Sequence, residues 1–302
     1  EFHHAYAALL VEVDTDGDWF VRQINATDAG DICDLDVFIK DGEVSTGQRA
    51  EVLTVELHGR QVDPQAFQTM YGDGGLVDAL QPRNQGLHDV LDFGSRSHHN
   101  TFFDVMEAHY HKEESVEGEC ETTAEVINRT LRPDMETWIA KGNHDEHMDR
   151  WLETADFKRD PVNAGFFIEA KAAKLAALRD RDTSFDLTAW AVGRAGIAAS
   201  VCFLGRLDEL EIAGIRHDQH GDVGPNGSRG SIRNTARLGQ KTNIGHSHSA
   251  GIFHGCYQNG TLSLLDMGYN RGPSSWSHSV IVTYHNGKRA IVTLKNGKWR
   301  AS

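Results

Sequence analysis

Five separated segments of the sequence place metal-competent side chains directly after an apolar run. They are VELHG (Glu56, His58), LHDVLDF (Asp89, Asp92), KGNHDEH (Asn143, His144, Asp145), IRHDQHGD (His217, His220) and IGHSH (His246, His248). Carboxylates, imidazoles and amides are ligands of divalent transition metals. Loops that follow neighbouring strands meet at one edge of a sheet, where α/β proteins build their sites. The pattern therefore predicts a metal site at a sheet edge.

Each segment taken alone also has a purely structural interpretation. The H-x-H of GHSH can be two histidines packed at a strand end. The GNHD segment can be a turn in which Asp145 caps the following helix. The HDVLD segment is weak by itself. It is the combination of all five segments, in this order along the chain, that favours a metal site.

That order is E-x-H, H-D-x-x-D, G-N-H-D, H and G-H-x-H, and it resembles the calcineurin-like metallophosphoesterase superfamily. The pattern of that superfamily is D-x-H, G-D-x-x-D, G-N-H-D/E, H and G-H-x-H. The match spans residues 56 to 248, and GNHD and GHSH are its most specific parts. The flanking segments HDVLDFGSRSHHN, HGDVGPNGSRGS and LDMGYNRGPSSW resemble phage-encoded members, some of them related to host-DNA degradation.

The resemblance implies a centre with two divalent metal ions. The residues it assigns to one ion are Glu56, His58, Asp89 and His248. The residues it assigns to the other are Asp89 as a bridge, Asn143, His220 and His246. Asp92 would contact the ligands and not the metal ions. Mixed nitrogen and oxygen ligands suit Mn, Fe, Zn, Co or Ni better than Ca or Mg alone, and Mn is the ion we expect.

Glu56 is the clear departure from the superfamily pattern, which has Asp at this position. Its side chain is one methylene longer, so its carboxylate reaches about 1.5 Å further. We expect the second metal site to fill first and the Glu56 site to be weak. On that interpretation, Glu56→Asp would raise activity at limiting metal.

His144 stands one position beyond a predicted ligand, so its side chain is expected to point toward the substrate. Asp145 follows it and could orient the ring, which would make a catalytic acid–base pair. In the superfamily, this histidine contacts the phosphate or protonates the leaving group. The alternative is a histidine that is only hydrogen-bonded within the turn.

Several other histidines compete for roles. His217 is an alternative to His220, which we prefer because a glycine-rich turn follows it. His98 and His99 could contact a substrate phosphate. His109 and His111 lie two residues apart on an expected helix, so they face different directions and do not share a metal.

A basic segment follows His220. The chain carries four bases and no acid from Val223 to Ser263. The four bases are Arg229, Arg233, Arg237 and Lys241. If this region is helical, these side chains form one stripe that could follow a phosphate backbone. A solvated helix face explains the spacing equally well.

The composition is that of an ordinary globular protein. The chain has 302 residues, of which 39% are hydrophobic and 25% charged, with a formal net charge of −14. Such a charge excludes binding of polyanions through the mean field of the protein. Four scattered cysteines indicate reduced thiols, and we expect a cytoplasmic protein without membrane contact. The chain starts Glu1-Phe2, which fits a cloning remnant on a piece of a longer protein.

The expected elements form a layered α/β protein. Residues 5–56 read as short strands, residues 64–131 as mainly helical with one long helix around 102–131, and residues 163–182 as an amphipathic helix. Strands return from about residue 198 and end in hairpins at HNGK and KNGK. The expected fold is a four-layer α/β/β/α sandwich of two mixed sheets in one domain, with residues 1–50 as a β-rich extension and 51–302 as the core.

The predicted function is hydrolysis of phosphodiester bonds in DNA by a two-metal enzyme. A phosphomonoesterase acting on nucleotides or proteins is the first alternative. A metal-poor pseudoenzyme that serves as a binding module is the second. The sequence is compatible with a homo-oligomer and, if the protein is phage-encoded, with the host cytoplasm.

Overall fold

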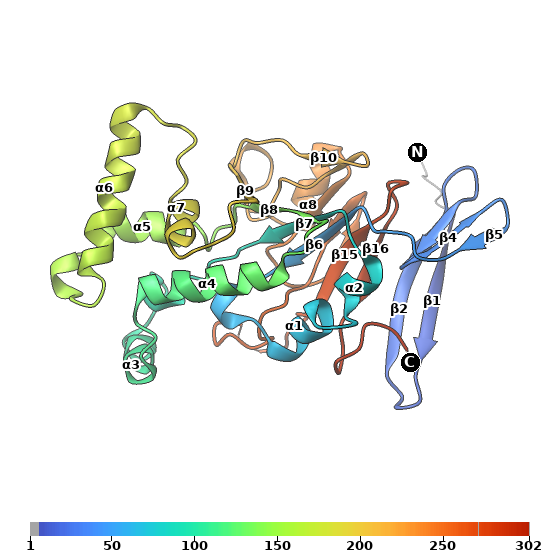
Figure 1. Ribbon diagram of the computed structural model, residues 1–302, viewed down its shortest axis with the longest axis horizontal. Coiled ribbons are helices and arrows are strands. Elements are labelled where there is room, and N and C mark those ends of the chain that lie inside the picture. The colour runs from blue at the N-terminus through green and yellow to red at the C-terminus, as the bar shows by residue number, and fades with distance from the viewer. Residues whose placement is uncertain (1–5, 271, 302) are drawn as a thin grey trace.

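The computed structural model describes residues 6–270 and 272–301, and it shows a mixed α/β protein built on two facing β-sheets (Figure 1). Glu1, Phe2 and Ala5 lie outside the described residues. In the part of the chain that the structure describes, none of the helices has the length and apolar character needed to cross a bilayer. The mixed α/β class expected from the sequence is confirmed.

The larger sheet has six strands in the order β16-β15-β6-β7-β8-β9. Their bounds are β6 (Val52–Glu56), β7 (Asn84–His88), β8 (Glu136–Ala140), β9 (Val201–Leu204), β15 (Ser279–Thr283) and β16 (Arg289–Thr293). Strands β6 to β9 are parallel, and the register pairs Glu56 with His88 and His88 with Ala140. Three successive parallel strands therefore end at the same level, and the loops that follow them open at one edge.

The smaller sheet has five strands in the order β10-β11-β12-β14-β13. Their bounds are β10 (Glu211–Ile212), β11 (Ile215–Arg216), β12 (Thr242–Ile244), β13 (Gly251–Phe253) and β14 (Cys256–Gln258). Asn243 of β12 donates to Thr54 of β6 at 3.3 Å and to Thr283 of β15 at 3.0 Å. These buried side-chain hydrogen bonds fix the two sheets face to face.

Helices α1 (Pro64–Tyr71), α2 (Leu76–Leu80) and α4 (Val116–Thr130) cover the outer face of the larger sheet. Strand β6 is buried along its whole length because helices cover one face and the second sheet covers the other. Helix α1 begins where Asp63 accepts a hydrogen bond from Ala66 N at 2.8 Å, with Pro64 as its first residue.

A second apolar core lies between helices at one end of the molecule (Figure 1). It is formed by α5 (His147–Thr154), α6 (Ala164–Asp180), α7 (Leu187–Arg194) and part of α4, whereas α3 (Phe102–His111) has no buried residue. Met148, Trp151 and Phe167 are buried there, and they anchor the segment that leads from β8 into α5. The short helix α8 (Ile232–Thr235) contacts β13 and β14 instead.

The N-terminal region forms two small sheets at the opposite end of the molecule from α6 (Figure 1). They consist of β1 (Ala7–Val13) with β2 (Trp19–Asn25), and of β3 (Ile32–Asp34), β4 (Val37–Lys40) and β5 (Glu43–Ser45). Asn25 donates to the carbonyl of Arg289 at 3.1 Å, and Leu35 N donates to the hydroxyl of Tyr284 at 2.9 Å. The region is therefore attached to the β15–β16 edge of the larger sheet.

Most of the predicted elements are confirmed, and two are wrong. The strands before residue 56, the helix at 163–182 and the HNGK hairpin are present. The long helix over 102–131 is instead two helices, α3 and α4, because Lys112 adopts a left-handed conformation and Ser115 caps a new helix. The KNGK segment closes only one bridge, between Lys295 and Lys298, rather than a full hairpin.

Candidate metal centre

The structure brings together three side chains assigned to the first metal. Glu56 ends β6, His58 follows two residues later, and His248 lies in the loop after β12. The Nε2 atoms of His58 and His248 are 2.8 Å apart, and each is 3.5 Å from Glu56 Oε1. All three side chains are buried, so one carboxylate and two imidazoles converge away from bulk solvent.

A second group lies beside the first and contains Asp89, His220 and His246. Asp89 follows β7, His220 lies in the loop after β11, and His246 follows β12. Asp89 Oδ2 is 3.1 Å from His220 Nε2, and the ligand atoms of the group lie within 4.8 Å of one another. Asn143 follows β8, and its neighbour His144 donates its backbone N–H to Asp89 Oδ1 at 3.1 Å. The role of Asp89 as a bridge between two ions stays a prediction.

Several buried polar atoms at the centre make no hydrogen bond of normal geometry among the described residues. Asn143 Oδ1 is one of them, and Glu56 Oε1 and His220 Nε2 lie only against other members of the centre, 3.5 Å from His58 and 3.1 Å from Asp89. Leaving a buried polar atom unpaired costs about 1–3 kcal/mol, so such atoms call for an explanation. Oxygen and nitrogen donors that converge without partners fit divalent transition metals of the Mn-to-Zn series. The residues present therefore fit metal binding.

The charges at the centre are arranged to keep the carboxylates ionised. Burial alone would raise the pKa values of Glu56 and Asp89, but the surrounding imidazoles, of which His220 contributes most, together outweigh burial and lower both pKa values. Burial would lower the pKa of His220, and the two carboxylates instead raise it to about 9. Metal binding would displace this proton, since an imidazole must be neutral to act as a ligand.

Four of the candidate ligands have backbone conformations that are rare for residues other than glycine. They are His58, Asp89, His246 and His248, with φ values of 51°, 41°, 77° and 58°. Each such conformation costs on the order of 1–3 kcal/mol and persists only where the surrounding structure enforces it. The concentration of this strain on predicted ligands indicates a functional site.

Two glycines allow the carboxylates to approach the backbone. A Cβ on Gly142 would lie 1.6 Å from Asp89 Oδ1, and a Cβ on Gly245 would lie 1.8 Å from Glu56 Oε2. Both distances are far below van der Waals contact. The glycines of GNHD and GHSH are therefore required at these positions because of steric space beside the acids.

Gly142→Ala is expected to displace Asp89 and to abolish metal binding by the second group. The overpacked centre should also lower the free energy of unfolding by about 1–3 kcal/mol. Gly193→Ala in α7 is the matched control, because a Cβ there meets nothing within 4 Å. Metal content and thermal unfolding of both variants measure the effect. Equal metal content in the two variants would contradict the assignment of Asp89.

Asp92 orients two imidazoles of the centre. Its Oδ1 lies 3.1 Å from His58 Nδ1 and 3.2 Å from His144 Nδ1. Burial lowers the pKa of His144, but Asp92 and Asp89 outweigh burial, so that its pKa lies above the ordinary value. With Nδ1 held by Asp92, Nε2 is the nitrogen of His144 left to carry a proton toward a substrate.

Asp145 does not have the role predicted for it. Its carboxylate accepts hydrogen bonds from Leu91 N and Gly142 N, both at 3.0 Å. The acid therefore ties the loop after β8 to the loop after β7, and it is Asp92 that orients His144. Burial, followed by the charge of Asp89, raises the pKa of Asp145 to about 7.

Two buried histidines near the centre differ in position. His217 packs against Trp138, with ring centroids 5.8 Å apart, whereas His220 reaches Asp89. His88 was missed by the sequence analysis although it stands where the superfamily pattern has glycine. Its Nδ1 lies 3.4 Å from His220 Nδ1, and its Nε2 has no partner among the described residues. The signal that could have identified His88 is the histidine of H-D-x-x-D, because the superfamily pattern has G-D-x-x-D at this point.

The arginines after His220 do not form the predicted stripe. Only Ile232–Thr235 is α-helical in this segment, and a 3-10 turn over Ala236–Leu238 follows it. The helical stretch is short because a tight turn at Gly227 precedes it and Gly239 ends it. The regular angular spacing is therefore lost. The side chains assigned to substrate binding are nevertheless exposed; they are Arg229, Arg233 and Arg237.

A cavity of about 580 Å³ opens beside the two metal groups. Its lining includes Asn143 and His144 from the loop after β8 and Asp92 from the loop after β7. His99, predicted to contact substrate, and Tyr269 also line it. None of the three arginines does. A substrate in this cavity would therefore face His144 with the metal groups behind.

The chain is similar to Protein A1 of Escherichia phage T5. The two are 37% identical over 309 aligned residues, which cover 99% of this chain and 55% of the phage protein. The chain thus spans about half the length of the curated relative it matches. No protein-family model matches the chain, and no solved structure matches it.

Proposed function

We propose that the protein is a two-metal-dependent phosphoesterase that hydrolyses phosphodiester bonds in DNA. The observation that supports this most is the adjacency of two buried groups of metal-competent side chains. They are Glu56, His58 and His248, and Asp89, His220 and His246. Two sheets face to face, with helices outside the larger one, are compatible with the four-layer metallophosphoesterase sandwich.

The proposed chemistry divides between the metals and the protein. Two divalent ions, when bound, would supply an activated water and neutralise charge on a phosphoryl group. Mn is the expected ion, and Fe, Zn, Co or Ni would also suit the ligands. Asp92 holds Nδ1 of His144. His144 then offers a proton from Nε2 to the leaving oxygen, which makes it the general acid.

Two features support a nucleic-acid substrate. Tyr269 lines the cavity and is 54% exposed, so its ring is available for stacking on a base. The segment from Val223 to Ser263 carries four bases and no acid in a chain of net charge −14. The similarity to a phage protein supports a phage origin, and the host cytoplasm is then where the enzyme would meet DNA.

A panel of substrates tests the proposal. We expect the Mn-loaded protein to cleave labelled DNA and bis(4-nitrophenyl) phosphate and to leave mononucleotides intact. Release of phosphate from mononucleotides, with intact DNA, would instead support a phosphomonoesterase. A protein that retains no metal after dialysis would be the binding module.

The contribution of Tyr269 can be isolated within the same panel. Tyr269→Ala should raise KM for DNA and leave hydrolysis of the small diester unchanged, because only a polynucleotide offers a base to stack. Tyr110→Ala is the matched control, since Tyr110 is exposed on α3 away from this cavity.

A further inference from the structure

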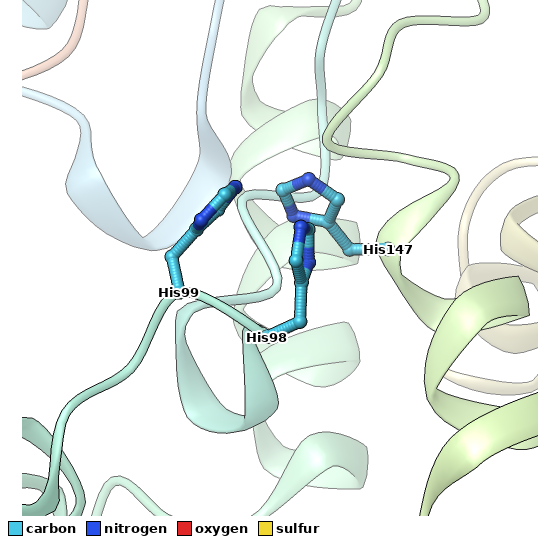
Figure 2. Close-up of side chains that lie close together, drawn as sticks. All are labelled: His98, His99 and His147. Carbon is cyan, nitrogen blue, oxygen red and sulfur yellow. The ribbon is translucent and has the colours of Figure 1, made fainter.

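Three histidines outside both metal groups point their rings toward one another at the rim of the cavity (Figure 2). His98 and His99 come from the loop before α3, and His147 is the first residue of α5. The ring centroid of His98 lies 3.8 Å from that of His99 and 4.8 Å from that of His147. One ring nitrogen from each histidine lies within 4.8 Å of the other two.

The loop that carries His98 and His99 is anchored just before the two histidines. The backbone N–H groups of Gly94 and Ser95 donate to the buried carboxylate of Glu119 at 2.8 and 2.9 Å. Arg96 forms a bidentate pair with Asp160 at 2.6 and 2.8 Å. The loop backbone is thereby fixed in place, and the two rings are presented to His147 before any ligand arrives.

The chemistry of the cluster suits a cation rather than an anion. Burial and the neighbouring His144 lower the pKa of His147 to about 4, and burial and the neighbouring His99 lower that of His98. Neutral imidazoles are metal ligands, whereas an anion would require protonated rings. The Nδ1 atom of His147 is also buried without a hydrogen-bond partner among the described residues.

We propose that His98, His99 and His147 form a third metal site, which binds one divalent ion of borderline softness as a Lewis acid, such as Zn²⁺, Co²⁺ or Ni²⁺. Three imidazoles are a sufficient protein ligand set for zinc with an open fourth position. Nitrogen ligands of a tetrahedral zinc at about 2.0–2.1 Å lie about 3.3 Å from one another. Rotation of the exposed His98 and His99 side chains closes the remaining distance.

The third site is separate from the two-metal centre but shares its cavity. None of its three histidines belongs to the two groups, and the His147 ring lies 4.8 Å from the ring of His144. His99 and His147 both line the cavity. The open position of the third ion would therefore face the same space as His144, where it can hold water or an oxygen of a bound ligand.

The test is the metal stoichiometry of the 302-residue chain. Protein stripped with chelator is loaded with Zn²⁺, dialysed and analysed for bound metal, and the absorption of the Co²⁺-loaded form is recorded. We expect His98→Ala and His99→Ala each to bind one equivalent less than the wild type and to lose one component of the Co²⁺ spectrum. His111→Ala, an exposed histidine on α3, is the matched control and should equal the wild type.

A further variant distinguishes failure of the third site from failure of the proposed two-metal centre. In Glu56→Ala, where the first metal group is broken, the equivalent that depends on His99 should remain. Unchanged stoichiometry in His99→Ala, or loss of this equivalent together with those of the two-metal centre, would overturn the third site. An unfolding temperature equal to that of the wild type confirms that each variant is folded.

Discussion

His144→Ala is expected to lower turnover by roughly 10²–10⁴-fold, the usual contribution of a general acid, while metal content stays the same. The imidazole lines the cavity without belonging to the two metal groups, and Asp92 holds its Nδ1 at 3.2 Å. Removal of the ring therefore removes a proton donor and leaves the ligands in place. Single-turnover rates together with bound-metal analysis measure the two quantities separately.

The leaving group of the substrate distinguishes a general acid from a residue that only positions the phosphate. A diester with a 4-nitrophenolate leaving group needs little protonation, so His144→Ala should affect it much less than DNA. His111→Ala provides the histidine control on α3. An equal loss for both substrates would show that His144 positions the phosphate and donates no proton.

The pH profile gives an independent test through Asp92, which acts on His144 as a positioning residue. The pKa of His144 lies above the ordinary value, and the acid form is the active one, so turnover should fall as the pH rises through that pKa. Asp92→Asn removes the carboxylate that raises the pKa, so the fall should move to lower pH. A uniform loss without a shift of the profile would mean that Asp92 only supports His58.

The sequence located the site because the parallel strands of the larger sheet end together. Register pairs Glu56 with His88 and His88 with Ala140, so the residues after three strands meet at one edge. Asp89 and Asn143 are brought to that edge by this alignment. A rule that needs only strand ends and ligand types therefore predicts which of these candidate ligands gather at one edge, without knowledge of the loop conformations.

Roles that depend on side-chain direction could not be predicted in the same way. Asp145 is adjacent to His144 in sequence, yet its carboxylate turns to the backbone of Leu91 and Gly142. Asp92 reaches His144 from another loop instead. The left-handed conformations of His58 and Asp89 redirect their side chains, and no periodicity in the sequence encodes such turns.

The cluster of His98, His99 and His147 shows the same limit. His98 and His99 were singled out in the sequence and His147 was not, and about fifty residues separate the loop from α5. The second apolar core decides their proximity, because Trp151 of α5 packs there against Phe93, which precedes the loop that carries His98 and His99. Packing between helices of this kind has no signature in the spacing of the histidines.

Glu56→Asp is expected to weaken metal binding by the first group by at least the roughly 10–100-fold typical for loss of a supporting partner. This prediction is the opposite of the one drawn from the sequence, and it rests on the contacts of Glu56. Glu56 Oε1 lies 3.5 Å from both His58 Nε2 and His248 Nε2, and Oε2 accepts a hydrogen bond from His246 N at 2.9 Å. A side chain shorter by one methylene would retract from all three partners by about 1.5 Å. Metal titrations of the wild type and the Asp variant measure the difference.

Gly245 provides the control, because it supplies the space that the longer acid occupies. Gly245→Ala alone should expel the carboxylate of Glu56, since the new Cβ would lie 1.8 Å from Oε2. In the Glu56→Asp background the acid has already withdrawn, so the same substitution should cost much less, and the two effects should be non-additive. Strictly additive losses, or a gain of metal affinity in Glu56→Asp alone, would mean that Glu56 is a poorly fitting ligand. Non-additive losses would instead show that Glu56 and Gly245 fit each other as a pair, the longer acid filling the space that the glycine leaves open.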